Sequence, residues 1–256
     1  MKRTLIALVA LSDLAGAAEL TTLVTMDELI AAAGTNTATK VQNMSVTTYE
    51  FGNGTYIGSI TMDALNTALA DSSQYITIAA WIKPTDTNGV ESIFGYGAQS
   101  NGFKFCTNGS GLQYTAKGVA DKDTAGAGIV ADTWTLVGIS FKAGTDAANG
   151  AKYIAGTANG NFYTRNLGGF ATPAEGDQTF AIGSGNSGDA REVFNGQIAG
   201  LTIFTSDSVI GGVNDITAIM GTTAPVMVAE PTIPEPTTAT LSLLALAGLA
   251  ARRRRK

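Results

Sequence analysis

The 256 residues of this chain include no histidine, so carboxylates, amides, hydroxyls, basic side chains and one thiol are the groups available for chemistry. The absence of histidine excludes Ser-His-Asp and Cys-His catalysis and any His-ligated zinc or iron site. The one cysteine, Cys106, excludes an intramolecular disulfide. It follows Phe103-Lys104-Phe105, an alternation typical of a strand, so we expect a packed, inert thiol rather than a reactive one.

Asp121 and Asp123 are the candidate metal ligands, and the metal they would suit is calcium. They supply two carboxylates at alternate positions, and Asp86 and Asp189 fall in other predicted loops. Calcium requires several hard oxygens that converge, which a loop at the rim of a fold allows. The alternative is a solvated turn in a glycine-rich stretch, with no cofactor.

The C-terminal end combines three parts that together predict an association with a membrane. Pro234-Glu235-Pro236 precedes an apolar run from Thr237 to Ala251. The chain then ends in five basic residues, Arg252, Arg253, Arg254, Arg255 and Lys256. A helix needs about 20 apolar residues to cross a bilayer, so this run spans it poorly or transiently, and the basic residues hold the end on the cytoplasmic side.

This order of parts, over residues 234–256, resembles the PEP-CTERM sorting tail. The resemblance implies recognition and processing at Pro234, Glu235 and Pro236 by an exosortase-type membrane enzyme of a Gram-negative bacterium. It also implies a location at the cell surface or in the extracellular matrix after a transient membrane stage. The alternative is a weak tail anchor with a basic flank.

Residues 1–18 are typical of a secretory signal, with Lys2 and Arg3 before an apolar run and Ala15-Gly16-Ala17 as the cleavage site. The general secretion machinery would then export the chain; the alternative is a short N-terminal helix.

Residues 19–234 carry 9 basic and 19 acidic residues, a net charge of −10. That sign excludes nucleic acid as a partner attracted by charge.

Short strands joined by glycine and asparagine turns fill residues 45–221, the predicted body. A lead-in, 19–44, precedes it with a helix from Met26 capped by Thr25, and a proline-rich linker, 222–233, follows it. We expect Thr47–Ile60 to form a hairpin around Gly52-Asn53-Gly54, and Thr61 to cap a second helix. The other predicted strands are Ile76–Lys83, which should be central, Ser92–Tyr96, Phe103–Thr107, Leu112–Ala116, Trp134–Phe141, Lys152–Ala155, Asn161–Arg165, Thr179–Ile182 and Gln197–Phe204. Without any βαβ alternation, they favour an antiparallel sandwich or barrel.

Four stretches in order resemble the LamG-like, concanavalin A-like jelly rolls: Tyr49–Ile57, Ile76–Pro84, Asp132–Phe141 and Phe194–Phe204. The resemblance implies an all-β fold, an antiparallel two-sheet jelly-roll sandwich, here with short helices and a C-terminal apolar helix. In such a fold we expect Trp81 and Trp134 to be core residues rather than platforms for a sugar.

Laminarinase-like glycosidases of the concanavalin A superfamily carry a Glu-x-Asp-x-x-Glu motif. Its nearest match here has Glu175 and Asp177 but Phe180 in place of the last glutamate. We therefore expect no catalytic residue and no enzyme. A carbohydrate site would draw on exposed aromatics and amides, for which the candidates are Tyr96, Tyr114, Phe162, Tyr163, Asn166 and Phe170.

The sequence leaves two hypotheses for the function. One is an exported, non-catalytic, surface- or matrix-associated sandwich with a structural or adhesive role beside extracellular polysaccharide. The other is a lectin-like or degenerate glycosidase domain that could use calcium.

Overall fold

The computed structural model describes residues 20–71, 73–97, 102–117, 120–124, 127–142, 151–157, 162–168, 179–186, 189–208, 220–221 and 223–229. The predicted signal at 1–18, Glu175 and Asp177, and the sorting tail at 234–256 with its apolar helix lie outside these residues. In the part of the chain that is described, no helix has the length and apolarity to cross a membrane. The chain divides into two compact units, Met1–Val226 and Met227–Lys256, and the first contains every element named below.

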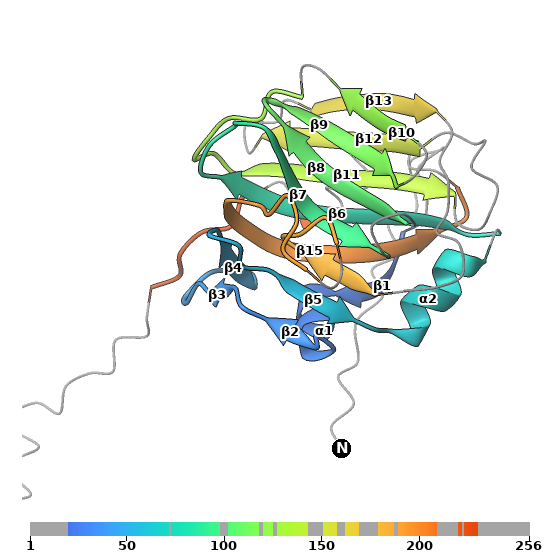
Figure 1. Cartoon of the computed structure of the whole chain (residues 1–256), viewed down its shortest axis with the longest axis horizontal. Helices are drawn as coiled ribbons and strands as arrows, with labels where there is room; N and C mark the ends of the chain where they lie inside the picture. The colour runs from blue at the N-terminus through green and yellow to red at the C-terminus, as the bar shows by residue number, and fades with distance from the viewer. Residues whose placement is uncertain are drawn as a thin grey trace, which may run out of the picture. The chain divides into compact units, whose positions relative to one another are not determined.

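Two antiparallel sheets form a jelly-roll-like sandwich, as predicted (Figure 1). The β6 sheet, named for its central strand, has the order β13-β12-β11-β6-β15-β4-β3, with β1 also on β15. Its strands are β1 (Thr21–Thr25), β3 (Thr39–Lys40), β4 (Thr48–Phe51), β6 (Tyr75–Pro84), β11 (Thr135–Lys142), β12 (Ala151–Thr157), β13 (Phe162–Gly168) and β15 (Gly196–Ser206).

The β8 sheet has the order β10-β9-β8-β7-β14-β5-β2. Its strands are β2 (Thr35–Asn36), β5 (Ile57–Ile60), β7 (Val90–Tyr96), β8 (Phe103–Asn108), β9 (Gly111–Ala116), β10 (Ala120–Thr124) and β14 (Phe180–Ile182). In Figure 1 the strands β7 to β10 overlie the layer of β6, β11, β12 and β13. The main hydrophobic core consists of buried side chains from both sheets.

Strand β6 is central, as predicted, and is apolar on both of its faces. Ile76, Ile78 and Ala80 belong to the main core, whereas Ala79 and Trp81 alternate to the other side. That outer side is covered as well. Trp81, only 3% exposed, packs in a second cluster with Ala79, Leu136, Ala199 and Phe204, against which Leu20, Trp134, Met220 and Ala224 also lie. Trp81 is therefore a buried packing residue as expected, and Trp134 is half-buried against the same cluster.

The lead-in is part of the sandwich, because β1 pairs with β15 and the helix α1 (Met26–Ala31) packs on the core. The predicted cap is confirmed. The Thr25 side chain accepts a hydrogen bond from the Glu28 backbone at 3.4 Å, and the Glu28 carboxylate accepts one from the Thr25 backbone at 2.8 Å. A second helix, α2 (Asp63–Ala70), also forms, but its N-cap is Met62, which makes no side-chain bond. The prediction of Thr61 as its cap was wrong.

The predicted hairpin at Thr47–Ile60 is wrong. Strand β4 pairs with β3 and β15 in one sheet, and β5 pairs with β14 and β2 in the other. The turn, with Asn53 at φ 52° and Gly54 at φ 82°, carries the chain between sheets so that Phe51 and Ile57 both enter the core. Strands β11, β12 and β13, by contrast, pair with one another in the order of the chain.

Candidate functional site

The outer face of the β8 sheet forms a polar floor because its strands alternate. On β8, Phe103 and Phe105 enter the core, which turns Lys104 outward. On β9, Leu112 and Tyr114 enter the core, which turns Thr115 outward. The registers of β7, β8, β9 and β10 place four residues in one row across the strands: Gly95, Lys104, Thr115 and Asp121.

The loop between β14 and β15 lies on this floor at Gly95. A Cβ added to Gly95 would stand 2.5 Å from the carbonyl oxygen of Gly185, so the two backbones are in direct contact. Ser184 fixes the loop from within, since its hydroxyl donates to the Asp189 carbonyl at 2.7 Å and accepts from the Arg191 backbone at 3.1 Å. At the far end, the backbone of Ser92 on β7 donates to the Glu192 carbonyl at 2.6 Å. The loop is therefore one wall of a site whose floor is β8 and β9.

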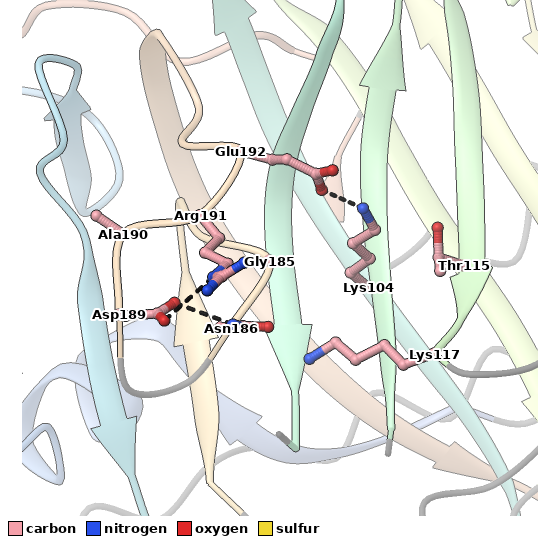
Figure 2. A pocket seen from close by; sticks show the side chains of 9 residues that line it. All are labelled: Lys104, Thr115, Lys117, Gly185, Asn186, Asp189, Ala190, Arg191 and Glu192. Atoms are coloured by element: carbon pink, nitrogen blue, oxygen red, sulfur yellow. Dashed lines mark hydrogen bonds and ion pairs between the residues drawn. The ribbon is translucent and has the colours of Figure 1, made fainter. Parts of the chain in front are cut away.

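Floor and wall enclose an open pocket of about 710 Å³ (Figure 2). It is lined by Lys104, Thr115, Lys117, Gly185, Asn186, Asp189, Ala190, Arg191 and Glu192. Three of these side chains are cationic and two are carboxylates. The lining residues thus carry one net positive charge in a body of strongly negative net charge, and the Asp121 carboxylate lies beside the floor on Thr115.

Each carboxylate of the pocket is engaged by a cation. Figure 2 shows the Lys104 ammonium on β8 and the Glu192 carboxylate on the loop directed at each other, and they form an ion pair. Arg191 Nε donates to Asp189 Oδ2 at 3.2 Å, and Asn186 Nδ2 donates to Asp189 Oδ1 at 3.0 Å. The polar groups of the wall are therefore oriented before any ligand arrives.

Lys117 closes one end of the pocket with a buried stem, since only 7% of the residue is exposed. Its ammonium donates to the carbonyl oxygens of Tyr96 at 3.1 Å and Gly97 at 2.9 Å. A lysine held in this way adds positive potential to the site from a fixed position.

Glu192 has a backbone conformation rare outside glycine, with φ at 46°. The bond from Ser92 and a parallel bridge between Ser92 and Val193 hold it there. Strain of this kind persists only where its surroundings impose it, and it concentrates at ligand sites.

The structure places the predicted calcium ligands on a strand rather than in a rim loop. The prediction of a loop was wrong, because residues Ala120–Thr124 pair with β9 as the edge strand β10. Asp121 is exposed and its Oδ1 accepts a bond from Thr115 Oγ1 at 2.6 Å, beside the pocket floor. Asp123 is also on β10 and lies opposite Gln113 of β9.

Across the described residues, no group of three or more Cys, Asp or Glu side chains is arranged to hold a metal ion. Of the other two aspartates considered, Asp189 lines the pocket, and Asp86 accepts a bond from the Asn88 backbone at 2.8 Å within its own turn. Calcium binding stays a prediction.

Two of the aromatic candidates are core residues, since Tyr96 and Tyr114 are buried and belong to the main core. Phe162, Tyr163 and Asn166 fall on β13, whose side chains the structure does not describe, and Phe170 lies outside the described residues. Cys106 is fully buried 3.3 Å from the Ser92 hydroxyl, and this burial raises the pKa of its thiol to about 12. Its burial agrees with the expected packed thiol, and its lack of reactivity stays a prediction.

The pocket itself was missed by sequence reasoning. The alternation Phe103-Lys104-Phe105 does indicate that Lys104 faces outward. Nothing local indicates that Arg191 and Glu192, more than 80 residues further on, return to cover it. That information resides in the long-range pairing of the sheets.

Two family models match the chain, and both resemblances are confirmed. The concanavalin A-like lectin/glucanases superfamily matches residues 52–207, and the PEP-CTERM protein-sorting motif matches residues 232–256. No curated protein matches the chain.

Several solved structures are similar to this chain. The CBM40 of the Ruminococcus gnavus IT-sialidase, bound to alpha2,3 sialyllactose, is 14% identical with a TM-score of 0.49, over 78% of this chain and 100% of that one. The leech intramolecular trans-sialidase is 18% identical with a TM-score of 0.46, over 76% of this chain and 29% of that one. The receptor binding domain of botulinum neurotoxin mosaic serotype C/D is 14% identical with a TM-score of 0.47, over 72% and 44%. This chain thus spans less than half of the latter two.

Proposed function

The chain belongs to the concanavalin A-like lectin/glucanases superfamily, and we propose that it is an exported, non-catalytic adhesive protein whose sandwich binds extracellular polysaccharide. Its PEP-CTERM motif marks an exported protein with a C-terminal sorting signal and implies processing by an exosortase, a membrane enzyme. The observation that carries the binding proposal is the polar pocket over β8 and β9.

The pocket has the chemistry that a saccharide requires. Sugar hydroxyls both donate and accept hydrogen bonds, so they are recognised by charged and amide side chains of fixed orientation. Asn186, Asp189 and Arg191 are linked to one another in this way on the loop. Its volume of about 710 Å³ is in the range of ligand sites, and no aromatic side chain is among the lining residues that the structure describes. Recognition by polar contacts alone suits an adhesive protein that gains strength from many copies.

The same contacts support a non-catalytic role. Hydrolysis of a glycosidic bond needs one carboxyl to protonate the leaving group and a second as nucleophile or base. The two carboxylates of the pocket, Asp189 and Glu192, are instead committed to ion pairs with Arg191 and Lys104. A purely structural module without a ligand is the second candidate, favoured by the lack of an aromatic platform among the described lining residues.

A glycan array probed with the mature, secreted protein tests the binding proposal. We expect binding to a polysaccharide that weakens about tenfold or more in Asn186→Ala and Arg191→Ala, since each removes hydrogen bonds made by an oriented group. Lys40→Ala on β3, an exposed lysine of the other sheet, is the matched control and should bind as the wild type does. Silence across a broad array would favour the structural module.

Intact mass of the protein recovered from native cell fractions tests the sorting proposal. We expect loss of both ends, near Ala17 and near Pro234. Replacement of Pro234, Glu235 and Pro236 by alanine should leave unprocessed protein in the membrane. A mature protein that keeps Arg252–Lys256 would mean a permanent tail anchor.

A further inference from the structure

We propose that the pocket selects saccharides that carry a carboxylate, and that Glu192 is the internal carboxylate which such a ligand displaces from Lys104. This inference rests on the proposed saccharide binding and adds the charge of the ligand. It concerns carboxylate-bearing polysaccharides as a class, of which a uronate polymer is one.

The first argument is the sign of charge along the surface. An acidic polymer is repelled by most of the body, whose residues 19–234 have a net charge of −10. In the pocket, cationic side chains outnumber carboxylates by three to two. The pocket therefore presents cationic side chains, Lys104, Lys117 and Arg191, to an acidic sugar that the rest of the body repels.

The second argument is the asymmetry of the Lys104–Glu192 pair. Lys104 stands on a strand in the middle of the sheet and its side chain is 14% exposed, whereas that of Glu192 is 43% exposed. The ammonium is thus fixed and sheltered, and the carboxylate reaches it from the solvent side. A position that already accommodates one carboxylate has the geometry to accept another in its place.

The third argument is the backbone of Glu192. Its φ of 46° is maintained by the bond between Ser92 and Glu192, so the strain serves to hold this one carboxylate over Lys104. An internal anion keeps the lysine from attracting small ions and yields to a ligand that brings a carboxylate together with hydroxyls for Asn186 and Arg191. Neutral sugars would leave the pair intact and use the hydroxyl contacts alone.

Calorimetric titration of the mature protein with an oligouronate, and with the same oligosaccharide after reduction of its carboxyl groups, tests the inference. Glu192→Gln keeps the shape and removes the competing charge. We expect it to bind the oligouronate about two- to fivefold tighter than the wild type, the range of one partly exposed ion pair, and the reduced sugar equally well. Lys104→Gln should lose preference for the oligouronate and keep the reduced sugar.

Glu50→Gln on β4 removes the same charge from the other sheet and is the matched control, with no change in either titration. Unaltered thermal unfolding of each variant shows that the fold is kept. If Glu192→Gln binds the oligouronate no tighter than the wild type does, the inference is overturned. If the proteins still bind the reduced sugar in that case, the proposed function stands. Equal binding of a sulfated oligosaccharide overturns the carboxylate preference in favour of charge alone. Failure to bind any of the sugars overturns the inference and the proposed function together.

Discussion

Asn195 holds both carboxylate oxygens of Glu91 across 104 residues of sequence. Its backbone donates to Oε2 at 3.1 Å and its side-chain Nδ2 donates to Oε1 at 2.7 Å. Glu91 lies on β7 of one sheet, and Asn195 immediately precedes β15 of the other. The pair therefore joins the two sheets beside the loop that forms the pocket wall. Only 6% of Glu91 is exposed, and this burial raises the pKa of its carboxyl above the ordinary value of 4.5.

The stability of the protein should depend on pH through Glu91. Because its pKa is higher in the folded than in the unfolded state, the folded state binds the proton more tightly, and stability falls as pH rises from about 4.5 through the folded pKa. Glu91→Gln removes this titration. Urea unfolding from pH 4 to pH 7 should show that the wild type has its greatest advantage over the variant at the acid end. An advantage that grows toward pH 7 would contradict the raised pKa.

Gly95→Ala should displace the loop that forms the pocket wall. The new Cβ would stand 2.5 Å from the Gly185 carbonyl oxygen, and both partners are backbone, so neither can move aside alone. We expect a loss of about 1–3 kcal/mol in unfolding free energy, typical of overpacking, together with loss of saccharide binding. Gly89→Ala is the control: its φ of 77° makes alanine unfavourable by about 1–2 kcal/mol, but no atom lies within 4 Å, and binding should persist. Crystallography of Gly95→Ala with the loop in place would refute the steric argument.

Cys106 should react with a thiol reagent only after global unfolding. The thiol is fully buried and burial raises its pKa to about 12, so the reactive thiolate is scarce at neutral pH. Titration with a disulfide reagent should label no thiol in the native protein and one per chain in denaturant. Val130→Cys places a thiol at an exposed position, 54% accessible as valine, and should react at once. Rapid labelling of native Cys106 would show that β8 opens locally.

The elements that sequence analysis located correctly are those whose signal is local. Thr25 and Glu28 are three residues apart and cap α1 through contacts between themselves. Ile76–Lys83 is apolar at every position but Thr77 and Lys83, which is sufficient to predict a strand covered on both faces.

The incorrect and missing predictions concern partners distant in sequence. The apolar and aromatic residues in Thr48–Phe51 and Ile57–Ile60 indicate that each is a strand with buried side chains. They do not show whether the two strands pair with each other or lie in opposite sheets, which depends on β15 and β14. In the same way, Asp121 lies in a stretch whose composition is typical of a loop. The stretch is an edge strand because it pairs with β9. The pocket could not be predicted for the same reason, since its floor and its wall come from parts of the chain that are distant in sequence.

The residues after the body should be attached to it as far as Val226, which bears on what sorting leaves behind. Val226 donates to the Ser45 hydroxyl at 3.1 Å and accepts from the Ser45 backbone at 2.8 Å, and Ala224 packs against the cluster of Trp81 and Phe204. Cleavage near Pro234 would keep all of these contacts. We expect a chain ended after Val226 to unfold at the same temperature and urea concentration as one ended after Ile233. A chain ended after Gly221 should lose about 1–3 kcal/mol, the range of two hydrogen bonds and a small apolar contact, and should show red-shifted tryptophan fluorescence as the cluster opens.

Ser45→Ala separates the two kinds of contact in this attachment. It removes the hydroxyl that accepts from Val226 but keeps the backbone bond, so it should cost about 0.5–1.5 kcal/mol without any spectral shift. Equal stability of the chains ended after Gly221 and after Val226 would mean that the attachment contributes nothing. The expected difference, by contrast, would mean that cleavage near Pro234 leaves a stabilising attachment of the sandwich in place.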